Sequence, residues 1–357
     1  MRIRLLAITT ALTTLAATTM AGAAAIAVVA PQAGPYALLG RQVFDGARVA
    51  AEAAGHTVLE LDESCEPGGS ADLVERMIEG EAIAAVGFLC TETLSDLLPQ
   101  LSQADIPAIT IGVRSQILME DALREGWPLY RLAPVEGDEA ERIGAVVLER
   151  WKAEAIAIID DGTIYGRELA SAVRQSIEAA GLSPVFVDTY RPGQEQQIAL
   201  VRRLHKAGAT HVVVGGDRND VAVIARDAAT ENIPLALLGG DTMRAADRPI
   251  PLTQGVMAVA VADHAALPPA TAAAVTLQAE NIALEGYVMP AYAAVQVIAE
   301  AASRDDAGNL SALLSGPTFQ TVIGPVAFDD GHELSDNPLR LQEWRSGRFV
   351  AADIPTE

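Results

Sequence analysis

The chain has 357 residues, a length that suggests two domains and allows a sizeable core. It carries 47 acidic residues against 25 basic ones, which gives a formal net charge of −22 at pH 7. This balance argues against nucleic-acid binding, which requires a basic surface, and otherwise only favours solubility.

The first residues have the parts of a secretory signal peptide. A basic start, Met1–Arg4, precedes the uncharged apolar stretch Leu5–Met20, and Ala21–Ala23 fits a small-x-small cleavage site. A membrane anchor is the alternative, but the apolar stretch is short and poor in leucine and isoleucine. We therefore expect residues 1–23 to be removed and the mature chain to be exported to the periplasm.

Cys65 and Cys90 are the two cysteines of the chain. An even, small number of cysteines in an exported protein favours one disulfide. Each cysteine follows a predicted strand, Thr57–Leu61 and Ile83–Leu89, and neighbouring parallel strands would bring the two loops together. Two free thiols or a metal site are the alternatives. No histidine is placed to complete a metal site, so we expect no metal and no cofactor.

The stretch Ile83–Thr93 contains the first candidate for ligand binding. Its apolar part is short enough for a buried strand, and the leucines from Leu94 to Leu101 follow at the spacing of one helix face. Thr91 therefore lies where a strand ends and a helix begins. Its hydroxyl could cap free backbone N–H groups, or those groups could hold an anion. Ligands collect at such strand ends in a parallel sheet, whereas a simple capping threonine is the alternative.

Predicted strands and helices alternate along the chain. A first series of strands is expected at Ile26–Ala30, Thr57–Leu61, Ile83–Leu89, Ile106–Ile111 and Leu129–Ala133. The helices expected between them are Gly40–Ala54, Ser70–Glu79, Thr91–Ala104 and Ile117–Arg124. A second series of strands is expected at Ala155–Asp160, Pro184–Tyr190, His211–Gly215, Leu235–Gly239 and Val256–Ala262. This order predicts an α/β fold with parallel-dominated sheets covered on both faces.

Helices are also expected in the second half of the chain, at Glu136–Trp151, Arg167–Ala180, Gln194–Ala207, Asn219–Thr230, Pro268–Leu284, Met289–Ala302 and Leu310–Ser315. Short strands and turns are expected in the tail, Phe319–Phe349. The two α/β series are similar in length and order. Two such lobes would meet with their strand ends facing a shared cleft.

Several different short motifs follow one another in a characteristic order over about 300 residues. They include VVAPQAGPYALLGRQVFDGA at Val28–Ala47, DESCEP at Asp62–Pro67, GFLCTET at Gly87–Thr93, IAIIDDGTIYGRELA at Ile156–Ala170 and LLGGDT at Leu237–Thr242. No single motif is specific, but their order resembles the periplasmic solute-binding proteins of ABC transporters, in the branched-chain amino-acid (Leu/Ile/Val-binding) group.

This resemblance implies a type I periplasmic binding fold, with two Rossmann-like lobes joined by three crossovers. The crossovers are expected near Leu132–Glu136, Ala262–Ala265 and Gly324–Phe328. The first lobe would then hold residues 24–132 and 265–325, and the second lobe residues 133–264 and 326–357. Closure of the lobes around a ligand by a hinge motion is expected for this fold.

The resemblance also assigns the anion end of the ligand site. The serine or threonine that binds carboxylate in the family corresponds to Thr91. Groups from the loop that contains Gly112 and Arg114 would complete this end of the site. The chemistry agrees with this assignment, because a helix N-terminus and a guanidinium both favour an anion.

The family takes the ligand's ammonium group with a backbone carbonyl near Gly112 and an acidic residue near Asp241. Tyr165 matches a tyrosine that closes over the ligand from the second lobe, and Tyr287 matches an aromatic position of the pocket. The alternatives are a solvated turn aspartate for Asp241, a surface-loop tyrosine for Tyr165, and a core or rim position for Tyr287.

Three positions depart from the family pattern. Leu39 and Asp217 stand where tyrosine is frequent, and Arg114 stands where a small hydroxyl residue is usual. The pocket should thus be less aromatic and more charged than one built for leucine. We therefore expect a small polar or zwitterionic amino-acid-like ligand. If Arg114 and Asp217 instead pair with each other or face solvent, leucine-like ligands remain possible.

The resemblance implies a binding component that feeds an ABC permease and its ATPase, and we expect a monomer. A periplasmic ligand-sensing receptor on the same fold is the alternative. An enzyme is not expected, because the chain has no G-x-S-x-G, H-E-x-x-H or P-loop motif and its five histidines are scattered. The pair Asp160–Asp161 could mimic a catalytic pair but is expected to cap the following helix or to line the cleft mouth.

Overall fold

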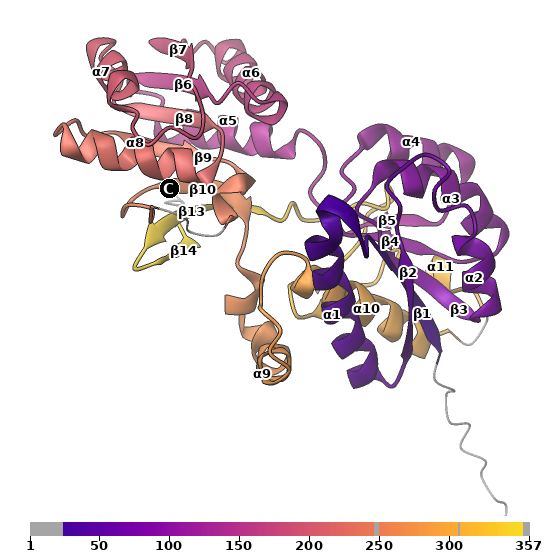
Figure 1. Cartoon of the computed structure of the whole chain (residues 1–357). Coiled ribbons are helices and arrows are strands. Elements are labelled where there is room, and N and C mark those ends of the chain that lie inside the picture. Colours follow the sequence, from indigo (N-terminus) through magenta and orange to yellow (C-terminus); the bar gives the residue numbers. More distant parts are fainter. Residues whose placement is uncertain (1–23, 246–249, 306–307, 353–357) are drawn as a thin grey trace, which may run out of the picture.

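The computed structural model describes residues 24–245, 250–305 and 308–352. The chain forms two lobes, each built around a sheet with helices on both faces (Figure 1). The predicted signal peptide, residues 1–23, lies outside the described residues. In the ranges that are described, no helix is long and apolar enough to span a bilayer.

The sheet of the first lobe has five parallel strands in the order β2-β1-β3-β4-β5. These strands are β1 (Ala25–Ala30), β2 (Thr57–Asp62), β3 (Ala82–Gly87), β4 (Ala108–Thr110) and β5 (Leu129–Arg131). The helices that alternate with them are α1 (Ala37–Ala54), α2 (Leu73–Glu79), α3 (Thr91–Gln103) and α4 (Gln116–Glu125). Every strand follows the sequence prediction, although β4 and β5 are shorter than expected.

Both faces of this sheet are buried, which explains the uninterrupted apolar runs of its strands. Ile26, Val28 and Ala30 of β1 lie in a core with α1 and α10 (Val288–Ser303). Ala27 and Val29 point to the other face, where they lie in a core with α2, α3 and α4. Successive side chains of a strand alternate between the two faces, so one strand serves both cores.

The sheet of the second lobe has seven strands in the order β14-β13-β10-β9-β8-β6-β7. Its parallel part consists of β6 (Ile156–Asp160), β7 (Phe186–Thr189), β8 (His211–Gly215), β9 (Ala236–Gly239) and β10 (Met257–Val261). Two antiparallel strands complete one edge, β13 (Leu339–Arg345) and β14 (Arg348–Ala351). The covering helices are α5 (Asp138–Arg150), α6 (Ile164–Ala179), α7 (Ile198–Lys206) and α8 (Arg218–Thr230).

The chain passes between the lobes after β5, after β10 and after β12 (Gly324–Val326). The segment between the second and third passages returns to the first lobe, where it forms α9 (Thr271–Ala279), α10, α11 (Leu310–Leu314) and β11 (Phe319–Thr321), which pairs with β12 (Figure 1). Val326 and Phe328 lie in the core of the first lobe, slightly beyond the predicted limit at residue 325. The lobe limits as a whole stay a prediction.

Among the elements whose bounds differ from the prediction, two have a clear physical reason. The helix expected at Pro268–Leu284 is helical only as α9, after the 3-10 turns His264–Ala266 and Pro268–Ala270. The strand expected to reach Leu89 ends at Gly87, because Gly87 and Phe88 have φ values of 114° and 56° and turn the backbone out of the strand. A Cβ at position 87 would lie 2.2 Å from the carbonyl oxygen of Val29, so only glycine fits there.

Candidate ligand-binding site

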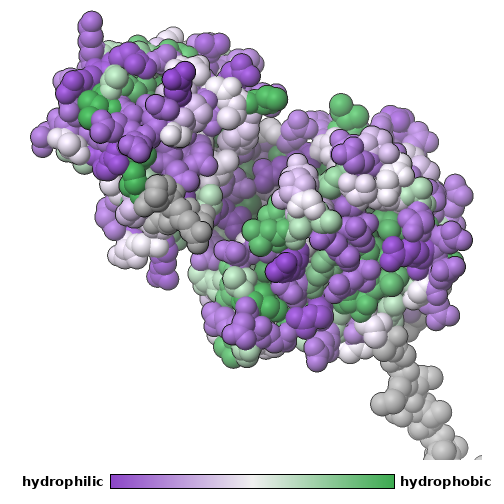
Figure 2. Space-filling model, in the orientation of Figure 1, coloured by the Kyte–Doolittle hydropathy of each residue, from purple (hydrophilic) through white to green (hydrophobic). Residues whose placement is uncertain are grey.

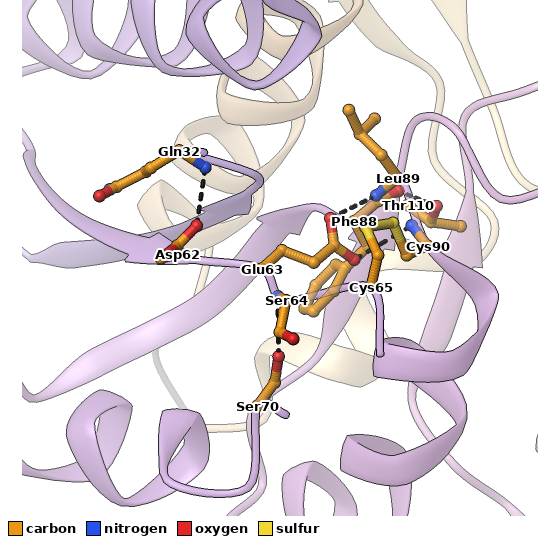
Figure 3. Close-up of a disulfide and its surroundings, with 10 residues drawn as sticks. All are labelled: Gln32, Asp62, Glu63, Ser64, Cys65, Ser70, Phe88, Leu89, Cys90 and Thr110. Atoms are coloured by element: carbon orange, nitrogen blue, oxygen red, sulfur yellow. Dashed lines mark hydrogen bonds between the residues drawn. A yellow bond between two sulfur atoms is a disulfide. The ribbon is translucent and has the colours of Figure 1, made fainter. Parts of the chain in front are cut away.

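The predicted disulfide is confirmed. Cys65 and Cys90 are bonded, with their Cα atoms 5.2 Å apart, and they join the loop after β2 to the loop after β3 (Figure 3). β1 lies between these two strands in the sheet, so the bridge spans the end of β1. Both loops are thereby fixed at the carboxyl edge of the first sheet, where parallel α/β proteins bind ligands.

The carboxylate of Glu63 lies beside this bridge and accepts backbone N–H groups from Leu89, at 2.8 Å, and Cys90, at 3.1 Å (Figure 3). Burial raises the pKa of Glu63 to about 7, and the two N–H groups oppose that rise. The N-cap of α3 is Cys90, and Thr91 is the first helical residue, so the alternative in which Thr91 is a simple capping residue was wrong. An internal carboxylate thus already occupies two of the N–H groups near this helix start.

One group among the described residues brings potential metal ligands together, namely Glu63, Cys65 and Cys90, whose ligand atoms lie within 4.8 Å of one another. The sulfur atoms of this group form the disulfide. They therefore have no thiolate to offer a metal ion.

The loop after β4 is shaped by Thr110. Its hydroxyl donates to the carbonyl oxygen of Phe88 at 2.9 Å and accepts the N–H groups of Val113, at 3.0 Å, and Gly112, at 3.4 Å. A Cβ at Gly112 would lie 2.7 Å from the Leu89 side chain, so the two loops approach closely here. This turn presents Arg114 at the carboxyl edge of the first sheet.

Arg114 of the first lobe forms an ion pair with Asp241 of the second lobe. Its Nη2 atom donates to Oδ2 of Asp241 at 2.9 Å, and the two side chains are 39% and 19% exposed. Burial alone would lower the pKa of Arg114, but the Asp241 carboxylate raises it above its usual value. The molecular surface is hollowed where the lobes meet, with polar and apolar residues along the hollow (Figure 2). The pair therefore joins the two edges that the ligand is expected to contact.

Asp241 follows β9 and is held by further contacts within the second lobe. Its Oδ1 atom accepts the N–H group of Val261 at 3.1 Å and lies 3.9 Å from a guanidinium nitrogen of Arg244. His264 is nearby, and burial together with Arg244 lowers the pKa of this histidine to about 4. The Asp241 carboxylate is thus held in place by its neighbours and is not a solvated turn residue.

Tyr165 and Asp241 both contact Glu139, a residue that was not predicted as part of the site. The Tyr165 hydroxyl donates to Oε1 of Glu139 at 2.7 Å, and the backbone N–H of Asp241 donates to the same oxygen at 2.6 Å. Burial raises the pKa values of Tyr165 and Glu139 above their usual ranges. The sequence did contain a sign that Glu139 is buried, because it lies at helical spacing from Ile143 and Val147, on the apolar face of α5.

The other predicted site residues have different positions. Tyr287 precedes α10, and its N–H donates to Oε1 of Gln42 at 3.1 Å. Its side chain is partly buried, and the Arg114 charge partly offsets the rise that burial causes in its pKa. Asp217 is exposed and caps α8 by accepting the N–H of Asn219. The alternative in which Arg114 pairs with Asp217 was therefore wrong, because Asp241 is the partner of Arg114.

The Asp160–Asp161 pair shapes the start of α6. Asp161 accepts both the N–H group and the hydroxyl of Thr163, at 2.9 Å and 2.6 Å, and Thr163 in turn caps α6 through the N–H of Gly166. Asp160 accepts the N–H of Gly162. The cap of α6 is thus Thr163 and not the aspartate pair, which instead builds the turn that orients Thr163.

The chain is similar to known proteins over most of its length. A family model described as periplasmic binding protein matches residues 24–348. The Leu/Ile/Val-binding protein homolog 3 of Brucella melitensis is 28% identical over 345 residues, which cover 92% of this chain and 93% of the relative. The leucine-, isoleucine-, valine-, threonine-, and alanine-binding protein of Pseudomonas aeruginosa is 25% identical, with 89% of each chain covered.

Solved structures show the same fold. An ABC transporter substrate-binding protein from Desulfitobacterium hafniense, in complex with Leu, superposes with a TM-score of 0.66 at 17% identity and covers 92% of this chain and 99% of its own. A solute-binding protein from Rhodopseudomonas palustris, in complex with p-hydroxybenzoic acid, gives a TM-score of 0.67 at 18% identity, with coverage of 93% and 96%. These likenesses confirm the predicted fold class.

Proposed function

Because this chain belongs to the periplasmic binding protein family, we propose that it is the substrate-binding component of an ABC importer. It captures a small polar or zwitterionic amino-acid-like ligand between its lobes. Residues 1–23 direct its export to the periplasm. There it works as a monomer and delivers its ligand to a membrane permease driven by an ATPase. It performs no chemistry on the ligand.

The observation that carries this proposal is the ion pair between Arg114 and Asp241. Each residue offers one charge to the space between the lobes. A zwitterion can exchange partners with this pair, with its carboxylate on the Arg114 guanidinium and its ammonium on the Asp241 carboxylate. Both contacts are charge-assisted, and guanidinium can hold a carboxylate with two parallel hydrogen bonds.

The surroundings of the pair support a polar ligand. Glu139 and Arg244 add a second negative and a second positive charge beside Asp241. A purely aliphatic side chain placed against these groups would leave buried charges without partners, which is costly. Tyr165 and Tyr287 contribute the aromatic walls, while Thr91, Gly112 and Asp217 complete the predicted contacts at the lobe edges.

The curated relatives support the amino-acid part of the proposal. Their names state that they bind leucine, isoleucine and valine, and that of the Pseudomonas aeruginosa protein adds threonine and alanine. Threonine joins the two charges of an amino acid to a small polar side chain. It is therefore the first probe for this site.

Calorimetric titration tests the proposal. L-threonine, which carries both charges, is compared with ethanolamine and 4-hydroxybenzoate, which carry only one charge each. We expect L-threonine alone to bind with micromolar affinity, and Arg114→Gln or Asp241→Asn to weaken it by at least about tenfold, or ~1.4 kcal/mol. Arg203→Gln is the matched control, because Arg203 pairs with Asp188 on the outer surface. Micromolar binding of leucine, isoleucine and valine that survives Arg114→Ala and Asp217→Ala would contradict the proposal.

A further inference from the structure

We propose that Glu139 is the positioning residue of the second lobe's half of the site, an inference that rests on the proposed function. Its carboxylate holds Asp241 and Tyr165 in the orientation in which they meet the ligand. Glu139 acts through these two residues and contributes little direct contact of its own.

The geometry places one oxygen atom at the meeting point of three elements. Oε1 of Glu139, from the first turn of α5, accepts the Tyr165 hydroxyl at 2.7 Å and the Asp241 N–H at 2.6 Å. Tyr165 lies in the first turn of α6, and Asp241 follows β9. Both donors were selected as ligand residues from the sequence alone. A single buried acceptor therefore sets their relative position.

The backbone beside Asp241 is adapted to this acceptor. A Cβ on Gly240 would lie 1.8 Å from Oε1 of Glu139 and 2.6 Å from the Tyr165 hydroxyl oxygen. Only a residue without a side chain lets the chain approach the carboxylate so closely. Gly240, the backbone N–H of Asp241 and the Glu139 carboxylate thus form one closely packed contact, which we call the joint.

The charges explain why a buried carboxylate is tolerated here. Glu139 is 8% exposed, and burial raises its pKa, while the two hydrogen bonds and the Arg114 guanidinium oppose that rise. Asp241 has its own negative charge close by, so the joint also concentrates negative charge on the side where the ligand's ammonium is expected. Removal of the Glu139 acceptor would free the Tyr165 ring and leave the Asp241 N–H without its partner.

Two substitutions separate positioning from charge. Glu139→Gln keeps an acceptor oxygen at the joint and removes the charge, whereas Glu139→Leu removes the acceptor at similar size. Glu149→Leu is the matched control, because Glu149 is exposed on the same helix. The unfolding free energy of each variant is measured first, so that a loss of fold is not mistaken for a loss of positioning.

The first readout needs no ligand. In the free protein labelled with nitrogen-15, we expect the Asp241 amide proton to move upfield and to exchange at least about tenfold faster in Glu139→Leu, because its hydrogen bond is lost. Glu139→Gln and Glu149→Leu should keep the wild-type behaviour. An unchanged Asp241 amide in Glu139→Leu would overturn the inference.

The second readout is calorimetric titration with L-threonine. We expect the affinity to fall about tenfold or more in Glu139→Leu and to stay within about threefold of wild type in Glu139→Gln. An equal loss in both variants would overturn positioning in favour of a charge effect. If the wild-type protein does not bind L-threonine, the proposed ligand class fails, and the amide measurement still decides the role of Glu139.

Discussion

Arg131, at the end of β5, is completely buried, and its Nε–H group donates a hydrogen bond to the Glu333 carboxylate at 2.7 Å. A second nitrogen, Nη2, donates to the other oxygen of the same carboxylate. Arg131 immediately precedes the first passage between the lobes, and Glu333 lies on the third. The remaining Arg131 nitrogen, Nη1, donates to the carbonyl oxygen of Ser115 at 3.0 Å. The pair therefore links the first and the third of the three segments that connect the lobes.

We expect Glu333→Gln to lower the unfolding free energy by about 3 kcal/mol, because it leaves the buried Arg131 charge without its partner. Denaturation by urea measures this loss. Asp188→Asn, which breaks the exposed pair with Arg203, should cost less than about 1 kcal/mol. The double variant Arg131→Met, Glu333→Leu should recover most of the stability. Equal losses in Glu333→Gln and Asp188→Asn would disprove the special role of the buried pair.

The disulfide gives a second prediction. Replacement of Cys65 and Cys90 by serine should lower the unfolding free energy by about 3 kcal/mol, since the bridge closes a loop with a sequence separation of 25. The intact mass of exported protein, with and without reductant, should show a chain that begins near Ala24 and gains alkylatable thiols only after reduction. Two thiols that react without reductant would contradict the bridge.

Glu63 should make stability depend on pH. Its folded-state pKa of about 7 lies above its ordinary value of 4.5, so the folded protein binds the proton more tightly than the unfolded chain. The stability due to this group is complete below pH 4.5 and is lost as the pH rises through 7. We expect a loss of about 2 kcal/mol between pH 5 and pH 8.

The measurement is the difference between wild type and Glu63→Gln, because Glu139 and Asp220 also have raised pKa values. His264 has the opposite sign, since its lowered pKa makes stability fall in acid, below pH 6.5. Because His264 is present in both proteins, its contribution cancels in this difference, and the comparison over pH 5 to 8 isolates Glu63. A Glu63→Gln variant with the same pH dependence as wild type would show that Glu63 does not titrate in this range.

Hinge closure is the last prediction. The proposed ligand groups lie on both lobes, with Arg114 on one and Tyr165 and Asp241 on the other. Small-angle scattering with saturating L-threonine should therefore show a smaller radius of gyration than the free protein. Asp241→Asn serves as the control at an L-threonine concentration that saturates the wild type but lies below the dissociation constant of the variant, where the variant should stay mostly open. An unchanged radius at saturation established by calorimetry would count against closure.

The sequence predicted every strand of the two parallel sheet regions, because their buried apolar runs are short and bounded by turns. It also predicted the disulfide, since both cysteines follow strands that the alternation places close together. It could not predict the pairing of Arg114 with Asp241, which are 127 residues apart and meet only because the lobes face each other. Glu139 was missed because a carboxylate in a first helical turn usually only complements the helix dipole.

The helix predicted at Pro268–Leu284 shows a different limit. Alanine gives a high helix propensity throughout this stretch, yet only Thr271–Ala279 is α-helical. The two prolines, Pro268 and Pro269, belong to a 3-10 turn that begins the stretch. An alanine-rich sequence does not show which face of a helix is buried. The ends of this helix are therefore set by its packing and cannot be read from the spacing of its apolar residues.

The discontinuous path of the chain has a consequence for biosynthesis. The apolar face of α1 is covered by α10, and the edge of the second sheet is completed by β13 and β14, so each lobe needs residues from the last quarter of the sequence. A nascent chain that ends before residue 288 lacks α10 over one face of its first sheet and the two antiparallel edge strands of its second sheet. We therefore expect neither lobe to finish folding until synthesis is nearly complete, which would suit the proposed export of this chain in an unfolded state.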